Sequence, residues 1–423
     1  MEELTKRLLS LLNVKSLNEI NESFIETDSL GNEKPEKYLL HALLSSLKGK
    51  DDQSWLWIWR GSAENSSDPV YDSLLKEYFK DKKKDQSQLS VLQASIEIAN
   101  QLHAISKGLS SHNVISKTLN YYPYYLDYSS DYTWNLLNQR STPSLNLKLR
   151  KLTMELLNNH DLFHFHFGTT LTFDYSDLPL LKTAQKPVIM HHWGSDVRLH
   201  SVALRTNPYA LVKDKNEEKI IQKLKTLSGS IKHCIIPDYE LFPYVKDFYE
   251  KVHIVPSMID LSKYVPKHDQ SKNKVPIIVH APTSPFIKGT KYILEAVEKL
   301  KTRHEFQFKL VQGISHEEAK EIYKQADLII DQLHIGSYGL FSVEAMALGK
   351  PVMCWITDEM KKHYPDDLPI ISANPDTIKD SLEYILKNLD MLSDVGKNSR
   401  IYVEKHHDAS VNSLLIRDIY QTL

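Results

Sequence analysis

One stretch of the sequence combines glycines, a carboxylate and a predicted strand–helix turn, and it is the best candidate for a phosphate-binding site. Residues 326–355 begin with an apolar run of strand length, continue through Gly336 and Gly339, and then show helical spacing from Leu340. Free backbone amides and the positive end of the helix dipole at such a turn attract a phosphate group. Glu344 lies one turn inside the predicted helix, so its carboxylate can reach sugar hydroxyls beside that phosphate.

Two histidines alternate with phenylalanines in a second predicted strand, within residues 160–170. The alternation places His164 and His166 on one face of the strand, and ligand sites in α/β folds lie where strands end. Metal binding is one interpretation of the pair, but no nearby cysteine or carboxylate cluster supplies further ligands. We therefore expect these histidines either to face a ligand or to be satisfied in the core, and we expect no metal site.

A third predicted strand, within residues 186–201, ends in the run HHWGSD. Gly194 permits close approach of the backbone to a ligand, so we expect Gly194 and Ser195 to line a cleft, with Asp196 as a further candidate. Asp196 and Arg198 could form a local ion pair or reach the ligands. All three motifs place polar groups at the ends of predicted strands, where doubly wound sheets bind their ligands.

Length and composition are those of a soluble globular protein. The chain has 423 residues, of which 41% are hydrophobic and 25% charged, and this length suggests roughly two to three domains. The net charge of −2 gives no case for a nucleic-acid partner. No stretch approaches the roughly 20 apolar residues that span a bilayer, which leaves a peripheral membrane contact open. Cys234 and Cys354 lie in apolar runs and predict buried free thiols in a reducing, cytoplasmic compartment, with the inner face of the membrane as a possible place of work.

Strand and helix patterns alternate in two series, which predicts an α/β protein with two doubly wound parallel sheets. The polar runs 80–88 and 267–275 are predicted linkers. A mainly helical accessory segment, an acceptor-side domain, a donor-binding domain and a terminal helix that packs back on the first domain are expected at residues 1–86, 87–268, 269–405 and 406–423.

Two aromatic runs allow more than one interpretation. Three tryptophans alternate in residues 54–62 as they would in a strand, with a helical turn as the rival assignment. A small hydrophobic core explains them better than a carbohydrate or partner platform, because a small segment needs large side chains to bury enough area. The run 120–134 is either an acceptor-facing loop or loop packing. Between the two runs, residues 96–111 predict an amphipathic helix.

The run GSYGLFSVEAMALGKPV, within residues 326–355, resembles the donor-binding signature of the family-four glycosyltransferases. The resemblance extends over roughly residues 89–423. It implies the B-type fold of that family (GT-B), in which two Rossmann-like domains face each other across a cleft. It also implies retaining transfer of a sugar from a nucleoside diphosphate sugar, a UDP-sugar first, with no metal or other cofactor required.

The resemblance also assigns roles to residues of this sequence. It implies that Lys288 and the glycine loop hold the donor diphosphate, that Glu344 binds the donor ribose, and that His166, with His164 as the fallback, faces the transferred sugar and the acceptor. His166, Lys288 and Glu344 are thus the expected catalytic residues. The expected donor-binding loop consists of Gly336, Ser337, Tyr338, Gly339 and Leu340, and the expected acceptor side of the cleft consists of Ser95, His164, Gly194, Ser195 and Asp196.

This sequence departs from the family pattern at two places. Gly336 stands where the family usually has a second glutamate, and no arginine precedes Lys288 in its loop. A non-catalytic nucleotide-sugar-binding or scaffolding protein on the same fold is therefore the alternative, and a nucleoside-diphosphate-sugar epimerase is a third interpretation. The expected partners are a nucleotide sugar and a glycan, lipid-linked or protein acceptor. The sequence does not specify the sugar, the base, the acceptor or the oligomeric state.

Overall fold

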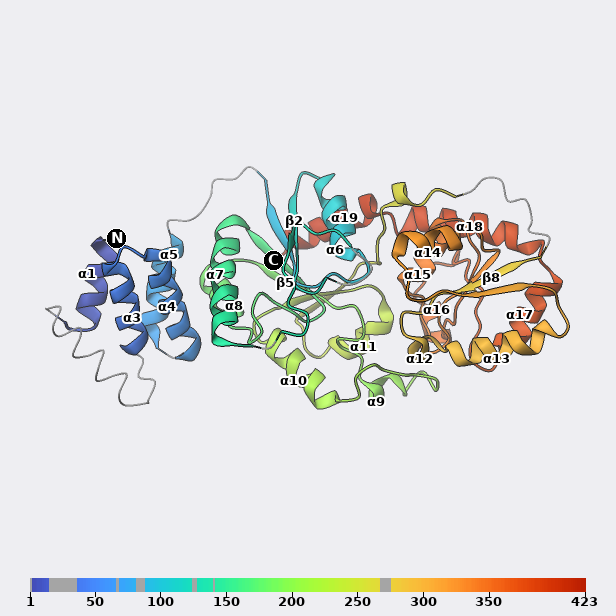
Figure 1. The fold of residues 1–423 in the computed structure, drawn as a ribbon, viewed down its shortest axis with the longest axis horizontal. Helices are drawn as coiled ribbons and strands as arrows, with labels where there is room; N and C mark the ends of the chain where they lie inside the picture. The colour runs from blue at the N-terminus through green and yellow to red at the C-terminus, as the bar shows by residue number, and fades with distance from the viewer. Residues whose placement is uncertain are drawn as a thin grey trace. The chain divides into compact units, whose positions relative to one another are not determined.

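The computed structural model of the chain describes residues 2–14, 36–65, 68–80, 88–123, 128–139, 141–266 and 275–423. The chain divides into two compact units (Figure 1). The first unit consists of Met1–Leu89, Asn138–Phe163 and Thr170–Pro187, and the second of Ser90–Leu137, His164–Thr169 and Val188–Leu423. The linkers predicted at 80–88 and 267–275 lie almost wholly outside the described residues.

The first unit is helical. Its helices are α1 (Glu2–Leu11), α3 (Glu36–Leu47), α4 (Asp51–Glu64), α5 (Pro69–Lys80), α7 (Pro143–Asn159) and α8 (Asp177–Thr183). The strand predicted for the tryptophan run is wrong, and the rival helical assignment is confirmed by α4. Ser54, Ile58 and Gly61 are buried at helical spacing, which the alternation of the tryptophans concealed. Two aspartates in the first turn of α4 lie at the positive end of the helix dipole and stabilise the start of the helix.

Trp59 fills the centre of this unit. It is 1% exposed, and its indole N–H donates to the backbone oxygen of Ser176 at 3.3 Å. The guanidinium of Arg150 lies 5.6 Å from the centroid of the Trp59 ring. Because Arg150 belongs to α7 and Ser176 precedes α8, the N-terminal helices share one core with two helices from much later in the chain.

The second unit contains two parallel sheets. The strands of the first sheet are β1 (Ser90–Ala94), β2 (Ile115–Asn120), β3 (Tyr132–Thr133), β4 (Leu162–His166), β5 (Val188–His191), β6 (His233–Ile236) and β7 (Lys251–Ile254), in the order β3-β2-β1-β4-β5-β6-β7. This is the order of a Rossmann sheet, whose ligand site lies at the switch point, here between β1 and β4. Its helices within this unit are α6 (Gln101–Ser110), α9 (His200–Ala203), α10 (Glu217–Ser228) and α11 (Phe242–Val245).

The helix expected over residues 96–111 begins only at Gln101. Ala99 and Asn100 have φ angles of 50° and 64°. These angles belong to the left-handed region, so a right-handed helix cannot include these two residues and begins after them. The residues between β1 and α6 therefore form a loop at the switch point.

The second sheet has the strands β8 (Ile277–His280), β9 (Gln307–Leu310), β10 (Leu328–Ile330) and β11 (Val352–Met353), in the order β11-β10-β8-β9. Every neighbouring pair in it is parallel, and its switch point lies between β8 and β10. The helices that accompany it are α12 (Pro285–Lys288), α13 (Thr290–Lys301), α14 (His316–Tyr323), α15 (Leu340–Ala347), α16 (Asp358–Lys361), α17 (Ile378–Lys387) and α18 (Met391–His406). The predicted fold class of two doubly wound parallel sheets is confirmed, as is the strand–loop–helix–strand unit made of β10, α15 and β11.

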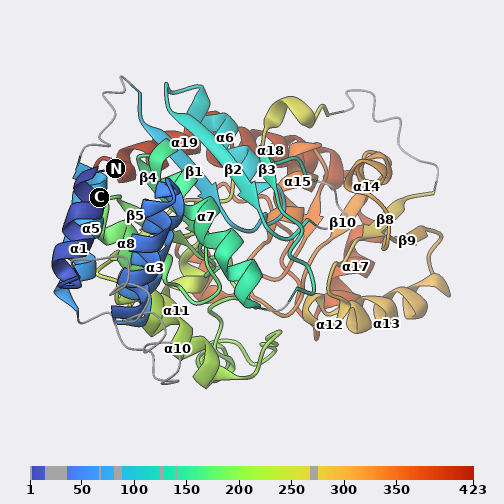
Figure 2. The same ribbon diagram turned by 60° about the vertical axis from the view of Figure 1, so that its left-hand side comes forward.

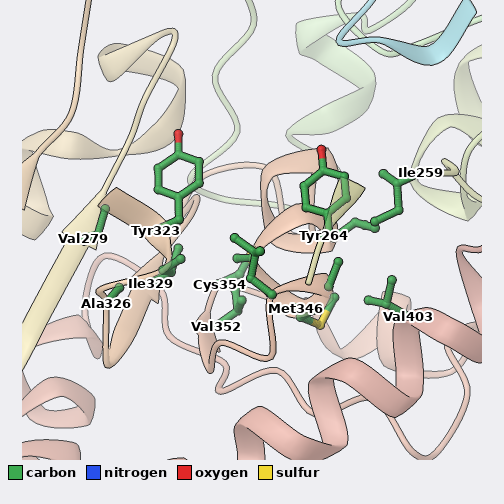
Figure 3. Packing of buried hydrophobic residues seen from close by; sticks show 14 of the residues in the cluster. Ile259, Tyr264, Val279, Tyr323, Ala326, Ile329, Met346, Val352, Cys354 and Val403 are labelled. Atoms are coloured by element: carbon green, nitrogen blue, oxygen red, sulfur yellow. The ribbon is translucent and has the colours of Figure 1, made fainter. Parts of the chain in front are cut away.

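A hydrophobic core holds the second sheet against its helices (Figure 3). It includes Val279 and Ile329 from the strands, Met346 from α15 and Val403 from α18. Cys354 lies in this core, and both cysteines are buried free thiols, as predicted.

The helix α19 (Ala409–Tyr420) follows the second sheet in the chain but packs against α6, a helix of the first sheet. The first sheet and its helices are called the first domain below. Figures 1 and 2 show it beside α6. The approach is close because Gly108 has no side chain: a Cβ there would lie 2.4 Å from the backbone oxygen of Ala409. At the end of α19, the hydroxyl of Tyr420 accepts a hydrogen bond from the side-chain amide of Gln93 in β1 at 3.0 Å.

Candidate functional site

A cavity of about 340 Å³ in the second unit is lined by loops that follow strands of both sheets. The first sheet contributes Ile98, Phe167, Trp193, Ser195, Arg198 and Asp238, and the second contributes Lys288, Ser337, Tyr338, Gly339 and Leu340. The loops after β1, β4, β8 and β10 flank the two switch points, so the cavity lies where doubly wound sheets bind ligands. Six residues that the sequence predicts for the site line it: Ser195, Lys288, Ser337, Tyr338, Gly339 and Leu340.

Lys288 is fixed by an ion pair before any ligand binds. Its ammonium lies 2.6 Å from Oδ1 of Asp331 and donates to Oε1 of Gln332 at 2.8 Å. Asp331 is fully buried and accepts from the hydroxyl of Ser342 at 2.6 Å and from the amide of Gly339 at 3.3 Å. Burial alone would raise the pKa of Asp331, but Lys288 and these hydrogen bonds outweigh it and hold the pKa below its ordinary value. Asp331 thus links Lys288 to the start of α15.

Gly336 has no room for a side chain. Its φ angle is +85°, and a Cβ there would lie 2.4 Å from Cγ2 of Thr357. The amide of Thr357 also donates to the backbone oxygen of Gly336 at 2.9 Å. The glutamate that the family usually has at this place could therefore not be accommodated without moving the loop.

Glu344 is engaged with two side chains of the second unit, Tyr264 and His316. Its Oε1 accepts from the hydroxyl of Tyr264 at 2.7 Å and lies 2.7 Å from Nε2 of His316. Burial would lower the pKa of His316, but Glu344 outweighs it and the pKa of His316 is raised. Glu344 is 7% exposed and is not among the described residues that line the cavity, although its neighbour Val343 is.

His164 and His166 are both fully buried, and neither lines the cavity. The indole N–H of Trp193 donates to Nδ1 of His166 at 3.1 Å, and Nε2 of His166 lies 2.9 Å from Oε1 of Gln93. Nδ1 of His164 lies 2.7 Å from the hydroxyl of Tyr420. The structure therefore places His166 behind Trp193, and Trp193 takes the place at the cavity wall that the resemblance implies for His166.

His191 joins the two histidines in a buried cluster that the sequence did not reveal. Ring nitrogens of His164, His166 and His191 all lie within 4.8 Å of one another. The three rings are nearly parallel, at 7° to 26°, with centroids 4.4 to 5.4 Å apart. An imidazole ligates along its ring plane, so near-parallel rings do not converge on one ion as tetrahedral ligation requires. Burial lowers the pKa of all three rings, that of His164 to about 3.

Asp196 holds the turn after β5. It accepts from Nδ1 of His192 at 2.7 Å and from the amides of Trp193 and Gly194 at 3.0 and 2.9 Å. Because Asp196 bonds the backbone of Trp193 and Gly194, it supports the cavity wall and does not itself line the cavity.

Of the two alternatives for Asp196 and Arg198, the ion pair between them is wrong, and Arg198 lines the cavity. Arg198 binds Glu240 with two nitrogens, Nε at 2.8 Å and Nη2 at 2.6 Å. Gly194 makes room for this pair: its φ angle is +120°, and a Cβ there would lie 2.4 Å from Nη1 of Arg198. Gly194 and Ser95 are not themselves lining residues; Ser95 is fully buried and donates to the hydroxyl of Thr169 at 3.1 Å.

Sequence reasoning did not single out Trp193, Lys213 or Asp238, although all three line the cavity, and Arg198 lines it as one of the two alternatives allowed. Trp193 lies inside the HHWGSD motif, and Asp238 follows the end of β6, so both carried a positional signal. Lys213 carried none, because it reaches the cavity from a loop remote from any strand end. Lys213 lines the same cavity as Lys288 and Arg198, and burial together with these two cations lowers the pKa of Lys213.

Comparisons with known proteins define the fold. No family model matches the chain. An MMP alpha-(1->4)-mannosyltransferase from Mycolicibacterium hassiacum is 25% identical over 159 residues, which is 31% of this chain and 36% of that protein. The chain thus matches about a third of the length of this relative.

Three solved structures are similar over most of the chain. A sucrose-phosphate synthase from Thermosynechococcus elongatus has a TM-score of 0.58 at 14% identity, covering 79% of this chain and 99% of that chain. A glycosyltransferase from Rickettsia africae has a TM-score of 0.56 at 13% identity, covering 80% and 99%. HepE from Anabaena, solved with UDP-glucose, has a TM-score of 0.56 at 11% identity, covering 79% and 100%. The chain therefore has the two-domain GT-B fold, while membership of family four stays a prediction.

The described part of the chain contains no helix that is both long and apolar enough to cross a membrane.

Proposed function

We propose that this chain is a glycosyltransferase that moves a sugar from a nucleoside diphosphate sugar, a UDP-sugar first, to an acceptor hydroxyl. The observation that carries the proposal is the charge of the cavity. Among its described lining residues, Arg198, Lys213 and Lys288 are cations and Asp238 is the acidic side chain, while Glu240 and Asp331 pair with Arg198 and Lys288 from outside the lining. Burial and Glu240 raise the pKa of Asp238, so its charge opposes the cations weakly. Such a lining complements a diphosphate.

The chemistry asks for charge stabilisation more than for covalent catalysis. When the bond between the anomeric carbon of the sugar and the diphosphate oxygen breaks, negative charge grows on the leaving phosphate. Lys288 is already oriented by Asp331, and preorganised charge of this kind costs no reorganisation during reaction. Lys213 and Arg198 supply the charge that the missing loop arginine would supply in the family, which supports transfer without a metal. Retention of configuration is the outcome that the resemblance implies.

The donor and the acceptor would enter from opposite sides of the cavity. In this proposal the loop from Ser337 to Leu340 holds the diphosphate, and Glu344 binds the ribose once its contact with His316 opens. Ser195 lies on the first-domain side, where an acceptor hydroxyl would approach the anomeric carbon. The mannosyltransferase relative and the UDP-glucose complex of HepE support a sugar nucleotide as the donor.

A non-catalytic nucleotide-sugar-binding protein is the second candidate. Two observations favour it: Gly336 leaves no room for a carboxylate near the transferred sugar, and Glu344 is already paired with His316. Turnover separates the two candidates.

The test measures release of free nucleotide from a panel of UDP-, GDP- and ADP-sugars by the whole chain, with thermal shift as the binding assay. Each reaction is run with and without EDTA and with acceptor glycan mixtures, and the anomeric configuration of any product is read by NMR. We expect binding and slow release from one donor, unchanged by EDTA, with a retained anomeric centre. Binding without release would favour the second candidate, and no binding of any donor would refute both.

A further inference from the structure

We propose that Trp193 is a stacking surface for a sugar ring in the cavity, and that His166 is the positioning residue that holds the indole in place. The inference rests on the proposed function, because it assigns a residue to the sugar of that reaction. It also gives His166 a different role from the one that the resemblance implies.

The indole of Trp193 is supported on one face and at one edge. The ring of His191 lies parallel to it, with centroids 4.0 Å apart at 16°. The ring of His166 is also nearly parallel, at 11°, but its centroid is 6.0 Å away, so it lies beside the indole edge to which it is hydrogen bonded. Trp193 is only partly buried and lines the cavity, whereas His166 and His191 are buried and do not line it. An aromatic face at a cavity wall suits the C–H face of a sugar ring, which is apolar while its hydroxyls point outward.

The hydrogen-bond directions are fixed by the chemistry of the groups. An indole N–H can only donate, so Nδ1 of His166 accepts from Trp193 and its Nε2 carries the proton. That proton is donated to Oε1 of Gln93 at 2.9 Å. The amide of Gln93 donates to the hydroxyl of Tyr420 at 3.0 Å, and this hydroxyl donates to Nδ1 of His164 at 2.7 Å. Donor to acceptor, a single chain of hydrogen bonds therefore runs from Trp193 at the cavity wall to Tyr420 at the end of α19 and on to His164.

These hydrogen bonds leave His166 no free nitrogen lone pair or N–H with which to transfer a proton. Its one lone pair is occupied by Trp193, its one proton is given to Gln93, and its side chain is fully buried. Desolvation also holds the pKa of His166 well below its ordinary value. A histidine in this state orients its neighbour and does not act as a general acid or base.

The first test compares nucleotide sugars with their parent nucleotides. Calorimetry measures UDP, UDP-glucose, UDP-N-acetylglucosamine, GDP and GDP-mannose binding to the wild-type chain, to Trp193→Ala and to Trp193→Phe. For a sugar that stacks on the indole, we expect the preference for the nucleotide sugar over its nucleotide to fall about tenfold in Trp193→Ala and less in Trp193→Phe. Nucleotide affinity should stay within twofold, which also shows that the variants fold. Trp57→Ala, in the other unit, is the matched control.

The source of the sugar ring follows from a second readout. If the ring belongs to the acceptor, the nucleotide-sugar preference is kept, and the acceptor concentration for half-maximal nucleotide release rises about tenfold in Trp193→Ala. An unchanged preference together with an unchanged acceptor requirement would overturn the inference. A wild-type chain that binds neither nucleotides nor nucleotide sugars would instead overturn the proposed function, so the two failures are distinguishable.

The role of His166 is tested with His166→Asn and His166→Leu. The asparagine oxygen lies near the place of Nδ1 and can accept from Trp193, but asparagine does not titrate; leucine can do neither. We expect His166→Asn to keep turnover within about threefold and the near-ultraviolet circular dichroism of the indole, and His166→Leu to lose both. If His166→Asn binds UDP normally but loses as much turnover as His166→Leu, His166 acts directly on the substrate and the inference is wrong.

Discussion

At the scale of single residues, Lys288 has two functions, one in catalysis and one in stability, and both would be lost in Lys288→Ala. In the proposed reaction it stabilises the leaving phosphate, and in the folded chain it neutralises the buried Asp331. We expect Lys288→Ala to lose about a hundred- to a thousandfold in turnover. We also expect it to lose about 3–5 kcal/mol of stability, because Asp331 is left as an uncompensated buried charge.

The double variant Lys288→Ala/Asp331→Asn isolates the chemical part. It removes both charges, so thermal unfolding should return toward the wild-type midpoint while nucleotide release stays low. Recovery of turnover together with stability would show that Lys288 is purely structural.

Asp177 predicts a pH dependence in the helical unit. It is fully buried, accepts from Leu171 N at 2.9 Å and from the hydroxyls of Thr170 and Thr172 at 2.8 Å, and burial raises its pKa to about 6. A carboxyl with a folded pKa above its unfolded value binds its proton more tightly in the folded state, so stability falls as pH rises from about 4 to about 6.

Asp177→Asn removes this titration. Relative to the variant, the wild-type chain should lose up to about 3 kcal/mol of stability between pH 4 and pH 7. The quantity to measure is the difference in unfolding midpoint between the two proteins at each pH. A constant difference would mean that Asp177 does not titrate in this window.

At the scale of elements, the loop between β10 and α15 depends on the backbone of Gly336. Gly336→Ala should weaken donor binding at least tenfold, because its left-handed φ costs about 1–2 kcal/mol for a side chain and the Cβ meets Thr357. Thr357→Ala in the same chain should relieve the steric part and leave the backbone part. Thermal shift with the preferred donor measures donor binding by both variants. If the double variant binds the donor as tightly as the wild-type chain, the φ angle of residue 336 makes no contribution of its own.

Sequence patterns identified the elements where the local signal and the tertiary structure agree. Buried apolar runs located the strands, the glycine motif indicated the α15 loop, and the family resemblance of the loop after β8 indicated Lys288. The patterns failed where local and tertiary preferences differ: alternating tryptophans in α4 imitated a strand, and Ala99, a strong helix former, has a left-handed φ angle. Lys213 was missed because only the fold brings it to the cavity. The role of Trp193 depends on its contacts with His166 in β4 and His191 in β5, which no local spacing encodes.

At the scale of the whole molecule, the helical unit is assembled from distant parts of the sequence. Deleting residues 1–86, which the sequence alone presents as an accessory segment, would remove Trp59 from its contacts with Arg150 and Ser176 and expose the inner faces of α7 and α8. We expect the shortened chain to aggregate. Trp59→Ala in the full chain should lower stability by about 3–5 kcal/mol.

Light scattering and thermal unfolding check both changes. A shortened chain that stays monomeric with an unchanged midpoint would show that α7 and α8 need no cover. Trp57→Ala serves as the control for Trp59→Ala, since Trp57 is only partly buried on the same helix.

The return of α19 to the first domain has a consequence for biosynthesis. His164 and Tyr420 are 256 positions apart, and at about 5–20 residues per second a ribosome needs roughly ten seconds to a minute to make the intervening chain. During that time the nascent first sheet lacks the helix that packs beside Gly108, and His164 lacks its hydrogen bond to Tyr420. The first domain therefore completes its fold only after the second has been translated. Until then the surface of α6 that α19 covers is exposed and can bind other chains.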